Sequence, residues 1–189
     1  MMKKLFLFFA LLISTNVLAD NFKPYIGINL GTNIADYNYQ TELDDIYYSA
    51  SLNAGLKIGS NFGAELFFTH SSTNELELVS DVQTQNHEFY YMAYGFDIFA
   101  YYPMTHEFDF FTSFGVANYK TYNEYDYIGL VNESDKISEN DVTTRFGIGV
   151  MFTLPHDGIS LLAQYQYIPI NNELIHTMSE FSIGARMNF

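Results

Sequence analysis

The sequence predicts an all-β fold, an eight-stranded antiparallel up-and-down transmembrane β-barrel. Three observations predict it: the closing segment alternates apolar and polar residues, seven further segments of this kind precede it, and the connections between them alternate between tight and long. Aromatic residues make up 18% of the chain, with Tyr 16, Phe 18 and Trp 0. That load is heavy for a soluble domain and typical of a barrel with aromatic girdles at two membrane interfaces.

Residues 1–19 are predicted to be a cleaved secretory signal peptide, which leaves residues 20–189 as the barrel domain. Lys3 and Lys4 form a basic start, residues 5–13 form an apolar core that is too short to span a bilayer, and Ala19 ends a cleavage site. The chain has no cysteine. A cysteine-linked lipid anchor and disulfides are therefore not expected.

Each predicted strand has an apolar residue at every second position, so one of its faces is apolar. In the closing strand, Phe181, Ile183 and Ala185 share one face, and Ser182 and Gly184 share the other. The predicted strands are residues 25–35, 48–59, 62–69, 88–102, 108–119, 142–153, 159–169 and 178–189. Eight strands of about ten residues match the smallest transmembrane barrels.

The connections predict how the barrel is oriented. After the even-numbered strands they are tight and rich in Gly, Pro, Asn and Asp, at residues 59–61, 103–107 and 155–158. After the odd-numbered strands they are polar and mostly longer, at residues 36–47, 70–87, 120–141 and 171–177. Short periplasmic turns that alternate with long external loops are expected in the outer membrane of a Gram-negative bacterium. Both termini would then be periplasmic and the loops exposed at the cell surface.

A resemblance supports this prediction. The strand and turn pattern, the glycine-rich strands at residues 27–31 and 146–149, and the final Phe189 resemble the small outer-membrane barrel group that includes the opacity proteins, OmpX and the OmpA transmembrane domain. By this resemblance, Gly184, Met187 and Phe189 would form the signal that the barrel-assembly machinery reads, after periplasmic chaperones have carried the chain. The absence of tryptophan departs from typical members. The competing fold is a soluble lipocalin-type barrel, which would have an apolar lumen and a polar exterior.

The face opposite the apolar one is predicted to line the lumen, and it carries five charged residues. An eight-stranded barrel is just wide enough to be filled by side chains, and buried charges need partners. We therefore expect Glu65 and Asp97 to pair among Lys57, Arg145 and Arg186. This network would act as a structural plug; a narrow pore lined by the same residues is the alternative.

One short segment suggests chemistry. His70 and Ser72 resemble the His-x-Ser motif of the outer-membrane lipid A 3-O-deacylase barrels, in which they would act as base and nucleophile. The motif lies nearer the carboxyl end in that family, and Thr73 stands here where that family has Asn. A polar rim at a strand end is the favoured interpretation, so the chain is not expected to be an enzyme.

The formal net charge of −14 argues against a nucleic-acid partner. No metal site or cofactor is expected, because the acidic loops lack the ordered spacing of calcium ligands. Outer-membrane lipid and lipopolysaccharide are expected partners. Lys120 and Lys136 are the only cations in the long loops, so divalent ions that bridge carboxylates to phosphates are expected rather than direct phosphate binding by lysine.

The predicted function is a surface adhesin or interaction protein, or an envelope-structural barrel. Loops on a rigid scaffold are where binding usually occurs, and tyrosine is enriched in binding hot spots. A host or serum protein could therefore contact loop tyrosines, for which the candidates are Tyr37, Tyr39, Tyr122, Tyr125 and Tyr127. The alternatives are a lipid A deacylase-like enzyme that uses His70 and Ser72, or a narrow pore.

Overall fold

The computed structural model describes residues 22–37, 45–79, 84–128, 133–155, 158–170 and 175–189. The predicted signal peptide lies outside the described residues. In the part that is described, no helix is long and apolar enough to cross a membrane.

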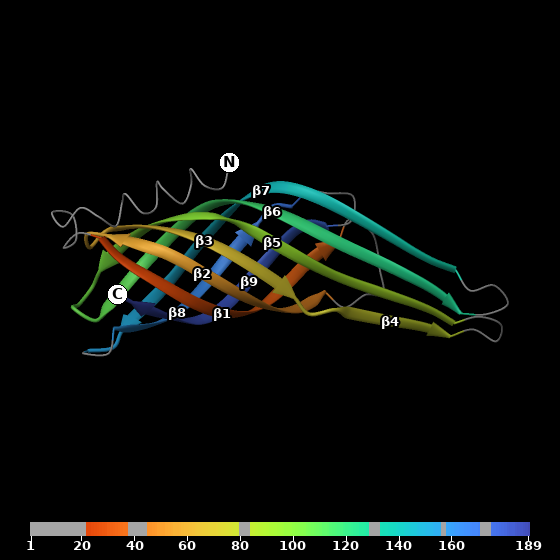
Figure 1. Cartoon of the computed structure of the whole chain (residues 1–189), viewed down its shortest axis with the longest axis horizontal. Coiled ribbons are helices and arrows are strands. Elements are labelled where there is room, and N and C mark those ends of the chain that lie inside the picture. The colour runs from red at the N-terminus through yellow and green to blue at the C-terminus, as the bar shows by residue number, and fades with distance from the viewer. Residues whose placement is uncertain (1–21, 38–44, 80–83, 129–132, 156–157, 171–174) are drawn as a thin grey trace, which may run out of the picture.

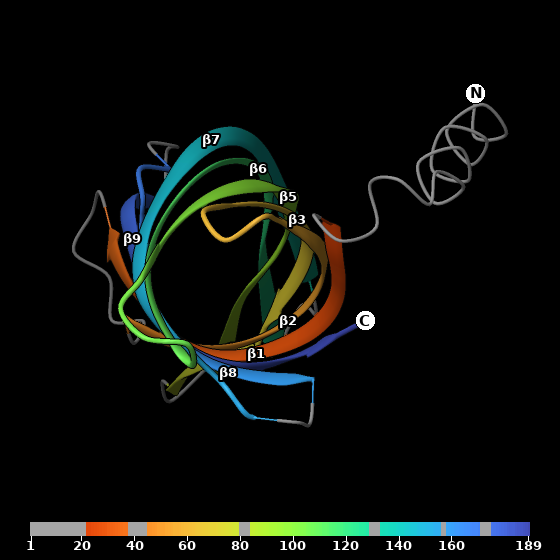
Figure 2. The ribbon, with the colours of Figure 1, turned by 90° about the vertical axis from the view of Figure 1, so that its left-hand side faces the viewer.

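The described residues form one closed antiparallel sheet of nine strands (Figure 1). The strands are β1 Phe22–Tyr37, β2 Ile46–Ile58, β3 Phe62–Ser71, β4 Asn74–Val79, β5 Thr84–Pro103, β6 Phe108–Ile128, β7 Glu133–Thr153, β8 Ile159–Ile168 and β9 Ile175–Asn188. β3 and β4 pair with successive stretches of β5, so they occupy one position in the barrel wall. The β3–β5 pairing closes a ring of eight positions (Figure 2), which confirms the predicted fold class.

The two faces of the wall are divided as the alternation predicts. Ile28 and Leu30 on β1 are 57% and 61% exposed on the outside, whereas Asn33 on the same strand is 0% exposed inside the lumen. The same division continues on β9, where Phe181 and Ile183 face outward and Ser182 is buried. An apolar exterior around a lumen that holds buried charges is the reverse of a lipocalin-type barrel, so that alternative is wrong.

The barrel has two different ends. The short turns after β2, β5 and β7 lie at one end, which we call the turn end. The start of β1 and the end of β9 lie at the same end. Two of these connections contain a glycine with positive φ, Gly59 at 61° and Gly158 at 63°, a conformation that other residues adopt at a cost. We call the opposite end the hairpin end.

The predicted long loops at residues 70–87 and 120–141 are wrong over most of their length, because the chain there continues as strands. β4 pairs with the start of β5 from Asn74 to Val79, and the β6–β7 ladder extends to Tyr127 opposite Glu133. The pairing of β7 with β8, by contrast, ends at Phe146. β4, β5, β6 and β7 therefore continue past the rest of the wall as a sheet, which we call the projecting sheet (Figure 1).

Candidate functional sites in the lumen and on the projecting sheet

The lumen near the turn end is built around Arg186, whose side chain is almost fully buried. Its Nη2 lies 2.8 Å from Glu65 Oε2, and its Nη1 donates a hydrogen bond of 3.0 Å to the Tyr101 hydroxyl. The guanidinium also lies over the rings of Tyr25 and Phe99, at 4.6 and 5.0 Å from their centroids. The contact with Glu65 is an ion pair without hydrogen-bond geometry. Arg186 thus links β9 to β1, β3 and β5 across the lumen.

A second ion pair lies toward the middle of the lumen. Arg145 Nε is 3.3 Å from Asp97 Oδ1, and Arg145 also donates a hydrogen bond to Gln166. The Arg145 guanidinium stacks on the Phe67 ring at 3.9 Å from its centroid. The carboxylate of Asp97 occupies space that Gly115 leaves open, because a Cβ at Gly115 would be 1.8 Å from Asp97 Oδ1.

The third predicted cation, Lys57, forms its ion pair with a carboxylate other than Glu65 and Asp97. Its ammonium lies 2.6 Å from Asp109 Oδ2 and over the Tyr101 ring, 4.6 Å from the centroid. Sequence reasoning did not include Asp109, which is the second residue of β6. Asp109 alternates along β6 with Phe111 and Ser113, which face the lumen. The period-two alternation of the strand is therefore the sequence signal that would place Asp109 in the lumen.

Sequence reasoning also missed Glu180, which is 4% exposed inside the lumen. It has the same parity on β9 as Ser182 and Arg186, and its carboxyl carbon lies over Gly31, 3.3 Å from the place of a Cβ there. The lumen therefore holds three buried carboxyl groups, of Glu65, Asp97 and Glu180, together with the two buried guanidinium groups of Arg145 and Arg186.

Apolar side chains fill the lumen above and below these charges. Toward the hairpin end a buried cluster contains Tyr47, Phe67, Phe89, Tyr91, Ala93, Ala117, Tyr119, Ile168, Ile175 and Met178, with neighbouring Ala35 and Ile170. Toward the turn end a smaller cluster contains Phe99, Tyr101, Phe111, Met151 and Leu162. This arrangement suits a structural plug better than a water-filled channel.

The structure places His70 and Ser72 on the outside of the barrel. His70 is exposed, and its Nδ1 lies 2.7 Å from the Ser71 carbonyl oxygen. The Ser72 hydroxyl accepts a hydrogen bond of 3.2 Å from the Tyr48 backbone N–H. Each side chain thus contacts backbone groups of the strand ends, as a polar rim would.

The outer face of the projecting sheet carries a second group of side chains, next to His70. Tyr90 on β5 stacks on Tyr122 on β6 with ring centroids 4.7 Å apart, and His70 stacks on the other side of Tyr90 at 6.1 Å. Lys120 lies over the Tyr122 ring at 4.8 Å, and Lys136 lies over the same ring at 5.1 Å. We call Tyr90, Lys120, Tyr122 and Lys136 the tyrosine–lysine patch.

Glu124 completes this surface. Lys136 forms an ion pair with Glu124, and the Tyr90 hydroxyl donates a hydrogen bond of 3.0 Å to Glu124 Oε1. The hydrogen bonds from the Lys136 ammonium and the Tyr90 hydroxyl hold the pKa of Glu124 below its ordinary value. The hydrogen bonds that Lys136 donates to Glu124 and to the Tyr90 hydroxyl raise the pKa of Lys136.

These shifts predict that acid loosens the β6–β7 hairpin. The folded hairpin favours ionised Glu124, so its stabilisation is complete above the ordinary pKa of 4.5 and is lost as the pH falls through the lower folded pKa. The protection of amides against hydrogen exchange, in β6 beyond Thr121 and in the β7 residues paired with it, should fall as the pH drops below 4.5, and it should fall more in the native protein than in Glu124→Gln. An equal fall of protection in both would contradict the prediction.

The five candidate contact tyrosines occupy different places. Tyr37 packs edge-on against Phe89, with centroids 6.4 Å apart, and so belongs to the apolar cluster at the hairpin end. Tyr122 is part of the tyrosine–lysine patch. Tyr125 and Tyr127 are strand residues of β6 whose side chains lie outside the described part, and Tyr39 lies outside the described residues altogether.

The three residues of the predicted assembly signal lie on β9 and just after it. Met187 and Phe189 are 50% and 68% exposed on the outside, and the Phe189 N–H donates to the Pro24 carbonyl at 2.9 Å. Gly184 faces inward opposite Asn29 on β1.

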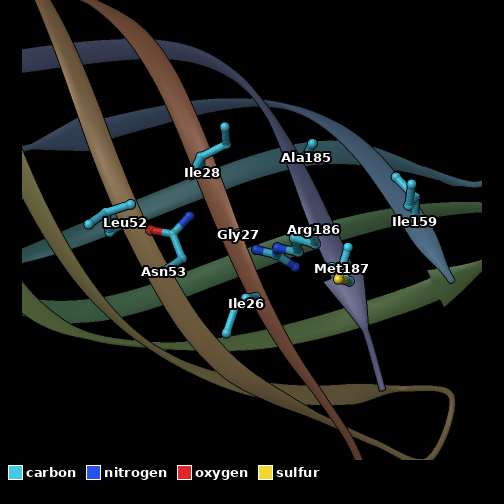
Figure 3. Close-up of a pocket in the computed structure, with 9 residues that line it drawn as sticks. All are labelled: Ile26, Gly27, Ile28, Leu52, Asn53, Ile159, Ala185, Arg186 and Met187. Atoms are coloured by element: carbon cyan, nitrogen blue, oxygen red, sulfur yellow. The ribbon is translucent and has the colours of Figure 1, made fainter.

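Near the turn end, β1, β2, β8 and β9 enclose a depression of about 450 Å³ (Figure 3). Its lining is mainly outward apolar side chains: Ile26, Ile28, Leu52, Ile159, Ala185 and Met187, with Gly27, Asn53 and Arg186 beneath. The depression therefore belongs to the apolar outer band. In the described part of the chain, no three His, Asp or Glu residues lie close enough to hold a metal ion.

Comparisons with known proteins agree with this architecture. Residues 5–189 match the family model described as outer membrane protein beta-barrel domain. Comparison with curated protein sequences finds no match. Three solved structures with similar folds are Ail of Yersinia pestis in complex with the heparin analogue sucrose octasulfate, Neisserial surface protein A, and a major outer membrane protein from Thermus thermophilus.

The likeness to these three covers nearly the whole barrel. Ail is 14% identical with a TM-score of 0.59 over 89% of this chain and 99% of its own. Neisserial surface protein A is 14% identical with a TM-score of 0.62, over 88% and 97%. The Thermus protein is 11% identical with a TM-score of 0.60, over 88% and 99%. At these identities the likeness concerns the fold.

Proposed function

Because the chain belongs to the outer membrane protein beta-barrel domain family, we propose that it is a surface interaction protein of the adhesin class in a Gram-negative outer membrane. The observation that carries the proposal is the projecting sheet. From Glu133 to Arg145, β7 extends beyond its last pairing with β8. At about 3.3 Å per strand residue this stretch is on the order of 40 Å long. A barrel that only reinforces the envelope has no need of such an extension.

The proposal includes an orientation. The hairpin end faces the outside of the cell, and the turn end with both termini faces the periplasm, as the short turns of bacterial barrels do. Residues 1–19 are removed as a signal peptide on export. The barrel-assembly machinery then reads the closing strand with Gly184, Met187 and Phe189.

The paired strands suit a binding role. A sheet that is already ordered loses less conformational entropy on binding than a loose loop of the same length. In the described residues, the stretch of β7 before Phe146 pairs as a strand only with β6. One side of such a strand offers backbone groups to an extended peptide of a partner protein.

The remaining functions have less support. His70 and Ser72 each contact backbone atoms, so an enzyme that uses them as base and nucleophile is not favoured. The filled lumen favours a plug over a pore. Ail was crystallised with a heparin analogue, but this chain carries 22 acidic and only 8 basic residues. A protein partner therefore suits its surface better than a polysulfated glycan.

Attachment of whole cells tests the proposal. The protein is expressed in a non-adherent outer-membrane host, beside a variant in which Asn-Gly replaces residues 125–135 and joins Glu124 to its ladder partner Lys136. We expect the native protein to raise cell attachment to cultured host cells at least several-fold and the shortened variant to lose that gain.

A second shortening supplies the matched control. Asn-Gly replaces residues 78–85 and joins Glu77 to its ladder partner Asn86, which trims β4 and β5 but leaves β6 and β7 intact. Retained attachment in this variant would assign the contact to the β6–β7 hairpin. If the native protein gives no gain over empty cells although the barrel is confirmed at the surface, the adhesin proposal fails.

A further inference from the structure

The chain has few positive charges, and their placement is uneven. Of the 8 lysines and arginines, two belong to the predicted signal peptide. Three more are in the lumen, where each pairs with a carboxylate, and Lys23 lies at the turn end. The two that remain of these lysines and arginines, Lys120 and Lys136, are at the hairpin end, and the structure brings both onto one tyrosine pair.

This gathering depends on strand register. Sixteen positions separate the two lysines in the sequence, but Lys120 lies two residues before Tyr122 on β6, and Lys136 lies opposite Glu124 on β7. All of these positions share the outward parity of Val116 and Phe114, which are exposed on the outside of the barrel. The register therefore places both ammonium groups over the Tyr122 ring, and that of Lys136 also over the Tyr90 ring.

The patch lies directly above the apolar band of the wall. On β3 the band ends at Phe68, and His70 follows on the same face. On β5 the exposed Tyr94 is followed by Met92 and then by Tyr90, and on β6 the exposed Val116 is followed by Asn118 and then by Lys120. Tyrosine and lysine at this height occupy the headgroup layer of a membrane.

Only one of the two ammonium groups of the patch is paired with a carboxylate in the described part of the chain. Lys136 is held by Glu124, which fixes its ammonium near the Tyr90 hydroxyl, at 3.1 Å. Lys120 forms no salt bridge within the described part of the chain, and its ammonium lies on the face of Tyr122. A fixed ammonium and a second ammonium without a carboxylate, both held on a stacked aromatic pair, offer positive charge to the phosphate of a phosphorylated sugar.

We propose that the tyrosine–lysine patch binds the phosphorylated glucosamine headgroup of lipopolysaccharide in the outer leaflet. Lys120 and Lys136 contact a lipid A phosphate, and the stacked rings of Tyr90 and Tyr122 hold the two ammonium groups in place. Direct binding by lysine at this one place replaces the expectation that only divalent ions bridge the acidic surface to phosphates. The location in the outer leaflet rests on the proposed orientation; the binding itself does not.

Native mass spectrometry of the folded, detergent-solubilised mature protein tests the site. The probes are lipid A with both phosphates and the same lipid with its phosphates removed. Basic residues at a membrane surface contribute about 1 kcal/mol each, so Lys120→Gln or Lys136→Gln should weaken binding of phosphorylated lipid A about fivefold, and the double variant on the order of 25-fold. Lys23→Gln, at the other end of the barrel, should leave binding unchanged.

Three results would overturn the proposal: equal binding of both lipids, equal binding by the native protein and the double variant, or displacement of the lipid by millimolar inorganic phosphate alone. A heparin fragment that binds through the same lysines, when lipid A does not, would assign the patch to a sulfated glycan instead. The heat-dependent gel mobility of each variant reports whether the barrel is folded. Protease cleavage of the β6–β7 hairpin on intact cells reports its orientation separately.

Discussion

Arg186→Ala is expected to lower the free energy of unfolding of the barrel by about 3–5 kcal/mol. The substitution leaves the carboxylate of Glu65, 4% exposed, without the guanidinium that lies 2.8 Å from it. It also removes the donor to the Tyr101 hydroxyl and the packing against the Tyr25 and Phe99 rings. Urea titration of the protein in lipid vesicles, followed by gel mobility of unheated samples, measures the change.

The double variant Glu65→Gln with Arg186→Met separates charge from packing. Replacing both members of a buried ion pair by neutral groups of similar volume is often close to neutral. We therefore expect the double variant to recover more than half of the loss. Lys23→Ala, an exposed position, should change the free energy of unfolding by less than about 0.5 kcal/mol. A double variant as unstable as Arg186→Ala would mean that the packing of the long side chain dominates.

The barrel wall could be predicted from the sequence because each strand there has one apolar and one polar environment. Ile28 and Leu30 face outward and Asn33 inward, and no local feature besides period two is needed to place them. The same parity places Arg145 and Arg186 in the lumen. The closing strand shows the pattern most cleanly, since Phe181 and Ile183 alternate with Ser182 and Gly184.

The projecting sheet could not be predicted in this way. Both of its faces lie outside the apolar band, so residues such as Asn123 and Glu124 show no apolar–polar alternation although they are in a regular ladder. The signal that remained was composition: Thr121 and Tyr122 belong to residue types that favour strands. Polar composition alone indicates a loop, whereas the strand propensity of the tyrosines agrees with the ladder that the structure shows.

The sequence also does not determine which charged side chains pair with each other inside the lumen. Lys57 on β2 meets Asp109 on β6, and Arg186 on β9 meets Glu65 on β3. These pairs join strands that are not neighbours in the wall, so they depend on the diameter and stagger of the closed barrel. The tyrosine–lysine patch also depends on how the strands are placed, because the register of β6 and β7 brings Lys120 and Lys136 over the same ring, that of Tyr122.

Gly115→Ala is expected to destabilise the barrel by about 3–5 kcal/mol, because it would separate a buried ion pair. The new Cβ would stand 1.8 Å from Asp97 Oδ1 and 2.6 Å from the Phe96 carbonyl oxygen. The Asp97 carboxylate must then move from its place beside Arg145 Nε, which is now 3.3 Å away. The free energy of unfolding in lipid vesicles measures the effect.

Gly184→Ala is a control with nearly the same geometry and a different charge. Its Cβ would stand 2.0 Å from Asn29 Oδ1 and 2.6 Å from the Ile28 carbonyl oxygen, so it displaces a neutral amide instead of a carboxylate. Overpacking alone should cost about 1–3 kcal/mol. The difference between the two variants in the free energy of unfolding thus measures how much the ion pair of Asp97 with Arg145 stabilises the barrel. Equal losses would mean that crowding of the wall determines the stability, and that the Asp97–Arg145 pair contributes little to it.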